Sequence, residues 1–270
     1  MQTISTTDLT QPTRHIFLSP HYDDIALSCG GTAALLARAG RTPEIALIFG
    51  DHPDPAQPMT DFAATMHRQW GMSAEQVVAG RRSEEQIAAL TLGACDRFLP
   101  FQDAIYRGSR YTSDDDLFGD THPDEVDLAG QIISHIGLER TSPAKIRIYA
   151  PLAIGGHVDH QHAERAGSLL AEQGYTVWFY EDLPYALRVE NVESRRSMLD
   201  PALEPRAAVD IERVWTTKVD AIMAYPSQLP TIFEQYVGVR ATRLGIEGAM
   251  GDYARAMGDG TLAERFWTTG

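Results

Sequence analysis

The strongest constraint on the fold is an alternation of strand and helix patterns within the first fifty residues. Residues 16–19 and 44–49 are short apolar runs of the length of buried strands. Between them, apolar residues over 25–39 recur at helical spacing, and Gly40 follows where a helix would end. Two strands joined by a helix form a βαβ unit, whose strands are parallel. The pattern therefore predicts an α/β fold with a mainly parallel sheet.

Patterns of the same kind continue along the chain. Further helices are expected over 60–70, 73–92, 123–136 and 158–173, and further strands over 98–101, 145–150 and 177–180. Residues 102–121 are polar and rich in Asp and Gly, which predicts a long surface loop and a candidate lid. From residue 190 onward the chain is expected to be mainly helical. Because no repeat or linker interrupts it, we expect one domain over residues 1–270, with 1–13 as a flexible tail.

Composition excludes several classes of partner. Lys and Arg number 23 against 37 Asp and Glu, a net charge of −14, so a nucleic-acid backbone or an anionic membrane surface is not an expected partner. The sequence contains no apolar run long enough for a membrane span and no signal-peptide pattern. The two cysteines, Cys29 and Cys95, cannot form a disulfide framework, which is consistent with a cytoplasmic protein. The oligomeric state stays open, a homo-oligomer included.

The first segment with candidate chemistry is His21-Tyr22-Asp23-Asp24, which directly follows a predicted strand. A His and a carboxylate within one turn can face the same metal ion, and zinc accepts both kinds of ligand. The same residues also suit the start of a helix, because Asp is favoured at the N-cap. Taken alone, the segment is explained somewhat better as a cap than as a metal site.

The second segment is His157-Val158-Asp159-His160, preceded by Gly155-Gly156. Here too a polar loop with Asp159 as a helix cap is an alternative to metal binding. His162 and Glu164, just downstream, could be extra ligands but are expected on an exposed helix face. Because both segments follow predicted strands, they are expected at the same edge of the sheet, where open α/β sheets bind ligands. Together they offer the ligands and proton-transfer groups of a metallohydrolase.

These residues also carry a resemblance to a known family. Residues 19–31 resemble the first signature of the LmbE-like, or PIG-L, family of zinc N-deacetylases, and 156–160 resemble its second signature. Tyr22 and Val158 stand where the family usually has proline. Similar segments elsewhere are Arg82-x-Glu84-Glu85 with Leu92-Gly93, residues 180–185, Lys218 with residues 225–228, and residues 264–267. The resemblance implies a Rossmann-like three-layer α/β sandwich with the active site at the carboxyl ends of the strands.

The resemblance also implies roles for individual residues. The implied ligands of one Zn²⁺ per chain are His21, Asp24 and His160. Asp23 matches the general base, and His157 matches the residue that stabilises the tetrahedral intermediate and protonates the leaving amine. Arg82 matches a substrate contact, and Asp159 is a secondary residue that could orient a neighbouring histidine. The implied mechanism has zinc and a protonated His157 hold the oxyanion while Asp23 takes a proton from water.

The expected activity is removal of an N-acetyl group from an N-acetylglucosamine-containing or related amino-sugar substrate, releasing acetate and an amine. Aromatic residues near the sheet edge are candidates for contact with a sugar, although for any one of them core or surface packing is the better explanation: Tyr106, Tyr111, Trp178, Tyr180 and Tyr185. Two alternatives remain. A metal-dependent phosphoesterase would need more carboxylates and a basic residue for phosphate. A sugar-binding relative without catalysis would lack one of the site residues.

Overall fold

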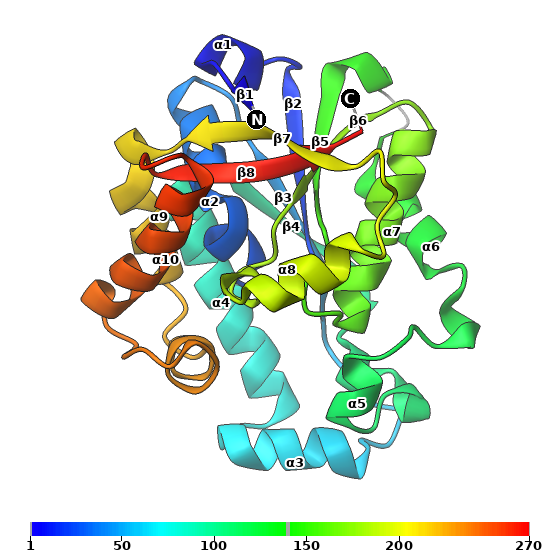
Figure 1. Ribbon diagram of the computed structural model, residues 1–270. Coiled ribbons are helices and arrows are strands. Elements are labelled where there is room, and N and C mark those ends of the chain that lie inside the picture. Colours follow the sequence, from blue (N-terminus) through cyan, green and yellow to red (C-terminus); the bar gives the residue numbers. More distant parts are fainter. Residues whose placement is uncertain (1, 139–140, 270) are drawn as a thin grey trace.

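A computed structural model of the chain describes residues 2–138 and 141–269, and Figure 1 shows its arrangement. Its strands form one eight-stranded sheet in the order β1-β7-β8-β6-β5-β2-β3-β4. The strands are β1 (Gln2–Thr3), β2 (Arg14–Ser19), β3 (Glu44–Asp51), β4 (Cys95–Gln102), β5 (Ile146–Pro151), β6 (Thr176–Tyr180), β7 (Glu204–Asp210) and β8 (Ala263–Thr268). All neighbours pair in parallel except β8, which is antiparallel to β6 and β7. The predicted α/β class is confirmed.

Helices cover both faces of the sheet. They are α1 (Thr6–Leu9), α2 (Asp24–Arg38), α3 (Asp61–Trp70), α4 (Ala74–Leu92), α5 (Asp114–Leu117), α6 (Leu128–Ile136), α7 (Val158–Glu172), α8 (Val189–Arg196), α9 (Trp215–Ile222) and α10 (Arg243–Met257), with a π-helix at Pro230–Val237. In Figure 1, α9 and α10 lie to the left of the sheet and α6 and α7 to the right. α2, α4 and α9 pack together on one face, while α7 packs on β5 and β6 with α6 beside it. This is the three-layer arrangement that the resemblance implied.

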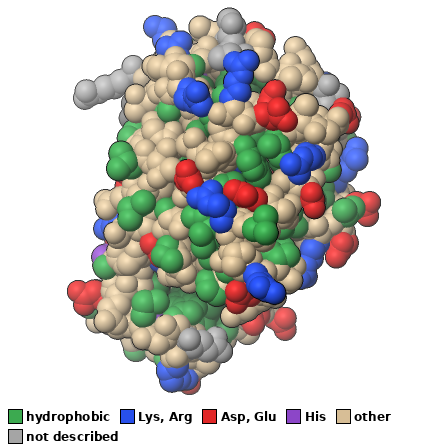
Figure 2. All heavy atoms as spheres, turned by 90° about the vertical axis from the view of Figure 1, so that its left-hand side faces the viewer, with side chains coloured by type: hydrophobic (Ala, Val, Ile, Leu, Met, Phe, Trp, Pro, Cys, Tyr) green, Lys and Arg blue, Asp and Glu red, His purple; other side chains and the backbone are tan. Residues whose placement is uncertain are grey.

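The central strands are apolar because both of their faces are covered. Every residue of β5 is buried, and in β2 only Arg14 is partly exposed. Strands covered on both faces become continuous apolar runs, and this is why the first βαβ unit was recognisable. None of the described helices has both the length and the apolar character that a membrane crossing requires. On the face shown in Figure 2, acidic and basic side chains are interspersed, so the negative charge does not gather into one patch there.

The expectation that the chain beyond residue 190 is mainly helical was wrong in one respect, because β7 and β8 lie in it. β8 was hidden by a charged residue at a buried position: Glu264 is only 5% exposed. Its carboxylate accepts hydrogen bonds from the backbone N–H groups of Gly31 and Thr32 and pairs with Lys218 at 2.6 Å. α2 is broken at Cys29, so these N–H groups lack helical partners. Because a buried position of β8 holds an acid that accepts hydrogen bonds from the broken helix, the strand could not be recognised by apolar alternation.

The expected flexible tail and the expected surface loop also differ from the structure. Gln2–Thr3 pairs in parallel with β7, and Leu9 is buried. Arg147 of β5 donates to the carbonyl oxygen of Leu9, which ties the segment to the sheet. Residues 102–121 contain α5 and two short 3-10 turns, and their buried side chains form a second apolar cluster with α3 and α7. Its buried members from this stretch are Ala104, Ile105, Tyr106, Tyr111 and Leu117.

Candidate metal centre and active site

The two His/Asp segments meet at the carboxyl edge of the sheet. β2 and β5 are neighbours, and each is followed by one of the segments. α2 begins at Asp24 and α7 begins at Val158, so both segments lie at helix N-termini. The sequence prediction that they share one site in space agrees with this topology.

Three side chains supply donors of the kind a metal ion needs. One potential ligand atom from each of His21, Asp24 and His160 lies within 4.8 Å of the other two. His160 Nε2 is 3.5 Å from Asp24 Oδ2, and the same oxygen accepts a hydrogen bond from the backbone N–H of His21 at 2.7 Å. Two imidazoles and one carboxylate are a ligand set that zinc accepts, and a fourth position would remain for water.

Each of the two histidines is held by a separate buried carboxylate. His21 Nε2 donates to Asp159 Oδ2 at 2.8 Å, and His160 Nδ1 donates to Asp182 Oδ1 at 2.7 Å. These bonds leave His21 Nδ1 and His160 Nε2 as the ring nitrogens available to a metal. A carboxylate behind a histidine fixes its orientation and makes it a better ligand, so the donor set fits zinc.

The charge around the two histidines also favours the binding of a cation. Burial by itself would lower the pKa of His160, but Asp24 and Asp182 outweigh it and raise the pKa to about 9. For His21 likewise, the lowering effect of burial is outweighed by Asp159, Asp103 and Asp24, and its pKa is raised. The buried carboxylates therefore create a negative site that attracts a proton or another cation.

Asp159 belongs to a buried charge network and does not cap α7. The cap is His157, whose Nδ1 accepts a hydrogen bond from the backbone N–H of Asp159 at 3.2 Å. Asp159 Oδ1 accepts from Arg107 at 2.5 Å, and Arg107 also pairs with Glu125 at 2.8 Å. Although burial opposes ionisation, Arg107 and His21 hold the pKa of Asp159 well below its usual value. The cap hypothesis for Asp159 was therefore wrong, and its contact orients His21.

His162 is buried at the far end of this network, where sequence analysis placed it on an exposed face. Its Nε2 lies 3.0 Å from Glu125 Oε2, and Tyr111 donates to the same oxygen. The helical spacing was correct, but His162 is 5% exposed because the face of α7 that it occupies packs against Glu125 and its neighbours. Arg107 and Glu125 were missed because nothing in a polar, Asp-rich stretch indicates which of its charges are buried.

Asp23 has an unusual backbone conformation. Its φ of 80° lies in the left-handed region, and its side chain forms no cap bond with α2. Burial raises the pKa of Asp23 to about 8, while Arg81, with Nη2 3.5 Å from Oδ2, partly offsets this. A strained, buried carboxyl group beside a metal-type donor set is a candidate for proton transfer. The helix-cap explanation of this segment does not hold for Asp23.

His157 is neutral in this environment. Burial lowers the pKa of His157 well below its usual value, and the neighbouring His21 adds to the effect. Because Nδ1 accepts the bond from the Asp159 N–H, the proton of the neutral ring is on Nε2. The role of a protonated His157 stays a prediction, while burial among these groups favours a neutral ring with an Nε2–H donor.

Arg82 does not lie with the other candidate residues. Its guanidinium is over the ring of Phe98, 4.4 Å from the centroid, and 3.8 Å from Asp51. The neighbouring Arg81 lines the cavity at the candidate metal centre and contacts Asp23. The two arginines point to different faces of α4 because successive helical residues are about 100° apart. Helical spacing could have distinguished the two arginines, because Arg81 is one turn from the buried Glu85 and therefore lies on the same face of α4.

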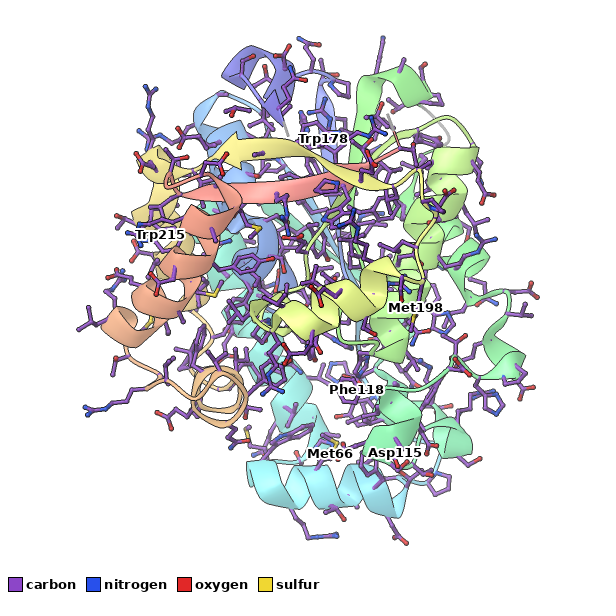
Figure 3. All side chains as sticks on the ribbon, viewed as in Figure 1. Met66, Asp115, Phe118, Trp178, Met198 and Trp215 are labelled. Carbon is purple, nitrogen blue, oxygen red and sulfur yellow. The ribbon has the colours of Figure 1, made fainter. Side chains whose placement is uncertain are left out.

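The candidate centre opens into a cavity of about 800 Å³. His21, Asp23, Asp24, His157 and His160 all line it. The outer wall comes from α3, residues 103–118, residues 184–191 and the π-helix region. Figure 3 shows Met66 on α3 and Phe118 after α5, both of which line the cavity. Of the five aromatic candidates, only Tyr185 lines this cavity. A cavity of this size is typical of small-molecule binding sites.

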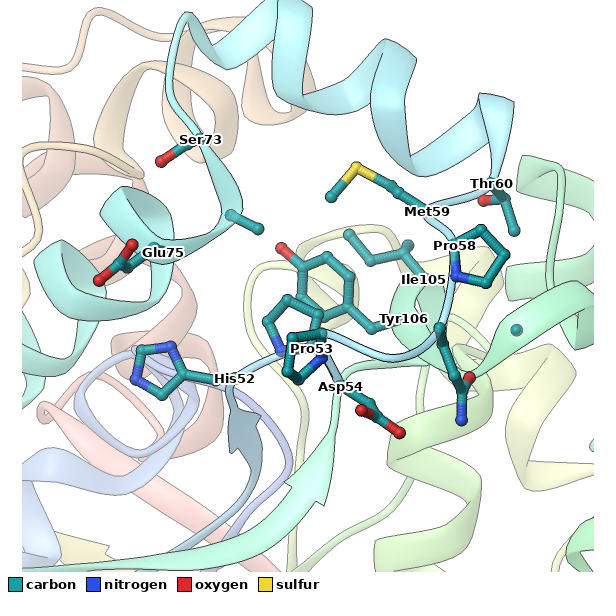
Figure 4. A pocket seen from close by; sticks show the side chains of 14 residues that line it. His52, Pro53, Asp54, Pro58, Met59, Thr60, Ser73, Glu75, Ile105 and Tyr106 are labelled. Atoms are coloured by element: carbon teal, nitrogen blue, oxygen red, sulfur yellow. The ribbon is translucent and has the colours of Figure 1, made fainter.

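A second groove of about 640 Å³ lies beside the first. It is formed by the connection from β3 to α3, the start of α4 and the turn at Ile105 and Tyr106, as Figure 4 shows. Ile105 lines both the groove and the cavity. The candidate metal ligands do not line the groove, so the chemistry of the site lies in the cavity.

The fold and the triad together define an α/β protein with a metal-type donor set at the carboxyl edge of a parallel sheet. The chain belongs to the PIG-L family: the family model described as GlcNAc-PI de-N-acetylase matches residues 16–171. A curated relative, 2'-N-acetylparomamine deacetylase of Streptomyces fradiae, is 33% identical over 221 residues, covering 80% of this chain and 73% of its own.

Solved structures agree with this membership. A deacetylase of the teicoplanin biosynthesis pathway has a TM-score of 0.75 and 26% sequence identity, covering 94% of this chain and 97% of its own. A zinc-inhibited form of teicoplanin deacetylase also has a TM-score of 0.75, with 25% identity and the same coverage. The curated relative and both of these solved structures are deacetylases.

Proposed function

We propose that this protein is a zinc-dependent N-deacetylase that hydrolyses the N-acetyl group of an amino-sugar substrate. The observation that carries the proposal is the placement of Asp23 and His157 beside the triad of His21, Asp24 and His160 in one cavity. Its support from relatives is the similarity to a 2'-N-acetylparomamine deacetylase in sequence and to a deacetylase of teicoplanin biosynthesis in structure. A metal site in this fold is supported by the zinc-inhibited form of teicoplanin deacetylase.

In this proposal His21 Nδ1, His160 Nε2 and an Asp24 oxygen hold the ion. Zinc, when bound, supplies Lewis-acid polarisation of the acetyl carbonyl and lowers the pKa of a water molecule. The carboxylates of Asp159 and Asp182 keep the two imidazoles oriented toward it. Positive charge at this position also favours the ionised form of Asp23 that can accept a proton.

The reaction then needs one proton taken and one delivered. Asp23 accepts a proton from water as the water oxygen bonds to the acetyl carbon, and the carbonyl oxygen becomes negative. His157 stabilises that oxygen through its Nε2–H. As the C–N bond breaks, the proton on Asp23 passes to the nitrogen, which leaves as the amine, and the acetic acid that remains releases its proton to solvent as acetate. This assigns to Asp23 the proton delivery that the family resemblance implied for His157.

The charge in the cavity favours an amino sugar over a phosphate ester. Asp103 and Asp114 line the cavity beyond the candidate centre, where Arg81 and Arg188 are the cationic side chains. With Asp23 and Asp24, the carboxylates outnumber the two arginines, and a bound Zn²⁺ would only balance this excess, so the cavity has no surplus positive charge for a phosphate dianion. Ammonium groups on a partly acetylated amino sugar would be attracted. The phosphoesterase alternative therefore receives no support from the cavity.

The test is a metal-reconstituted assay. The protein is stripped with a chelator, reloaded with zinc to one ion per chain, and incubated with 2'-N-acetylparomamine, N-acetylglucosamine and N-acetylglucosaminyl-inositol. We expect acetate and free amine in equal amounts from at least one of them, and loss of both in the stripped protein. Turnover that is independent of metal, or no acetate from any of the three, would refute the proposal. The latter result would also revive the non-catalytic sugar-binding alternative.

A further inference from the structure

A buried acid–phenol pair lies directly behind the proposed general base. Glu85 of α4 is 1% exposed and Tyr225, which follows α9, is 2% exposed. Tyr225 donates its hydroxyl hydrogen to Glu85 Oε2 at 2.8 Å. The same oxygen accepts a hydrogen bond from the backbone N–H of Asp23 at 3.3 Å. One carboxylate oxygen thus joins α4, the chain after α9 and the catalytic segment.

The backbone N–H that donates to Glu85 belongs to Asp23, whose backbone conformation is strained. A non-glycine residue at a φ of 80° is in a sterically disfavoured backbone conformation, so contacts around it must hold it there. Two residues of α4, Glu85 and Arg81, do so. Arg81, one turn before Glu85, has Nη2 3.5 Å from Asp23 Oδ2 and contacts the Tyr22 carbonyl oxygen at 3.5 Å. α4 therefore contacts both parts of Asp23: Arg81 lies against its side chain, and Glu85 accepts its backbone N–H.

Folding stability alone does not account for Glu85. No ion pair of Glu85 is formed with any residue in the described part of the chain. Burial raises its pKa to about 7, which reflects the cost of placing this acid in the interior. A leucine of similar volume would avoid that cost, because replacing a buried polar group with an apolar one is often neutral or stabilising. Its role as hydrogen-bond acceptor for the Asp23 N–H accounts for the carboxyl group of Glu85 at this buried position.

We infer that Glu85 and Tyr225 are positioning residues for Asp23: Glu85 accepts the Asp23 N–H and Tyr225 fixes the Glu85 carboxyl group. This inference rests on the proposed role of Asp23 as general base. Glu85 does not touch the substrate and does not exchange a proton with it. Its removal lets the backbone at Asp23 relax from the left-handed region, so the Asp23 carboxylate leaves the line of the attacking water. The expected loss is in the chemical step, with zinc and substrate binding preserved.

The test compares Glu85→Leu, Glu85→Gln and Tyr225→Phe with wild type, each zinc-loaded and assayed with the best substrate of the amino-sugar panel. We expect kcat of Glu85→Leu to fall at least about tenfold with KM changed less than about twofold, because a misplaced base costs turnover and not binding. Glu85→Gln retains an acceptor oxygen and should recover most of kcat. Tyr225→Phe should lie between the two.

A matched control comes from the adjacent residues. Ser227 donates its hydroxyl hydrogen and its backbone N–H to Glu84, so Ser227→Ala removes a side-chain bond between the same two elements without reaching Asp23. We expect it to keep wild-type kcat. Zinc content and melting temperature are measured for every variant, so that a folding defect is recognised.

The outcomes separate this inference from the proposed function. A wild-type protein that releases no acetate would overturn the proposed function and this inference with it. An active wild type whose Glu85→Leu variant keeps full kcat would overturn the positioning role alone. So would a Glu85→Gln variant as impaired as Glu85→Leu, because an uncharged acceptor would then not suffice. A kcat loss in Glu85→Leu that Glu85→Gln recovers, with zinc content unchanged, supports the inference.

Discussion

His160 Nδ1 and Asp182 Oδ1 lie 2.7 Å apart, and both side chains are almost fully buried. The other oxygen of Asp182 accepts the backbone N–H of Ile154 at 2.9 Å. Asp182 therefore fixes the ring of His160 relative to the chain between β5 and α7. His160 presents its other nitrogen toward Asp24, which is the geometry of a metal-ligating histidine supported by a carboxylate.

Loss of that support should weaken metal binding. We expect Asp182→Asn to raise the Kd for zinc by roughly 10- to 100-fold, since such outer carboxylates typically contribute this much. Competition with a zinc chelator measures the constant directly. Glu181→Gln is the control, because Glu181 is also buried but bonds to Tyr253, Arg265 and Trp267. Equal zinc affinity in wild type and Asp182→Asn would show that Asp182 does not support the ligand.

Substitutions of Arg81 and of Arg82 should differ in their effect on turnover. Arg81 lines the cavity and contacts Asp23, whereas Arg82 packs over Phe98. We expect Arg81→Ala to lower kcat/KM by about tenfold or more and Arg82→Ala to change it less than about twofold, as losing a positioned cation costs transition-state stabilisation. Steady-state kinetics with zinc-loaded protein measures both. The reverse order would return the substrate contact to Arg82.

Asp114 tests whether the cavity selects cationic substrates. It is exposed and lines the cavity, so Asp114→Asn should raise KM for a substrate with free ammonium groups by roughly two- to fivefold at low salt. The effect should shrink at high ionic strength because solvent-exposed charges are screened. Asp115→Asn is the matched control: Asp115, labelled in Figure 3, is exposed but does not line the cavity. A KM that is indifferent to charge and salt would argue for a neutral substrate.

Glu125 makes the fold sensitive to acid. Burial favours its neutral form, but His162, Arg107 and Tyr111 outweigh this and lower the pKa of Glu125 from its usual 4.5 to about 2. Because the folded pKa is lower than the unfolded one, ionised Glu125 stabilises the fold above pH 4.5. This contribution is lost as the pH falls toward 2.

Glu125→Gln should therefore be less stable than wild type at neutral pH, and the gap should narrow between pH 4.5 and 2. Urea unfolding at a series of pH values measures it, with the exposed Asp124→Asn as control. A gap that stays constant through this range would mean that the charge of Glu125 is not what stabilises the network. A wider gap at low pH would contradict the sign of the shift.

The part of the fold that could be predicted is the part governed by local pattern. β2, α2 and β3 were recognised because strands buried on both faces are apolar throughout and the helix between them has its own period. The same logic placed the segments at His21 and His157 at one edge of the sheet. In those cases the topology of parallel strands brings distant segments together.

What could not be predicted depends on contacts between distant residues. Asp182 follows β6, and only the fold shows that it faces His160. β8 was not recognised because Glu264 is charged, and the residue that matches its charge, Lys218, is 46 residues earlier in the chain. Residues 102–121 resembled a solvated loop because the partner of Arg107, Asp159, is 52 residues away. Arg81 was passed over for its neighbour, since two adjacent arginines differ only in the helix face that they occupy.

The most direct test of the central claim measures zinc content and acetate release together in two variants. Asp23→Asn should retain about one zinc per chain and lose turnover by roughly 10²- to 10⁴-fold, the usual contribution of a general base. His160→Ala should lose the zinc itself, and its turnover with it. An Asp23→Asn variant with near-normal acetate release, or a His160→Ala variant with full zinc content, would contradict the account.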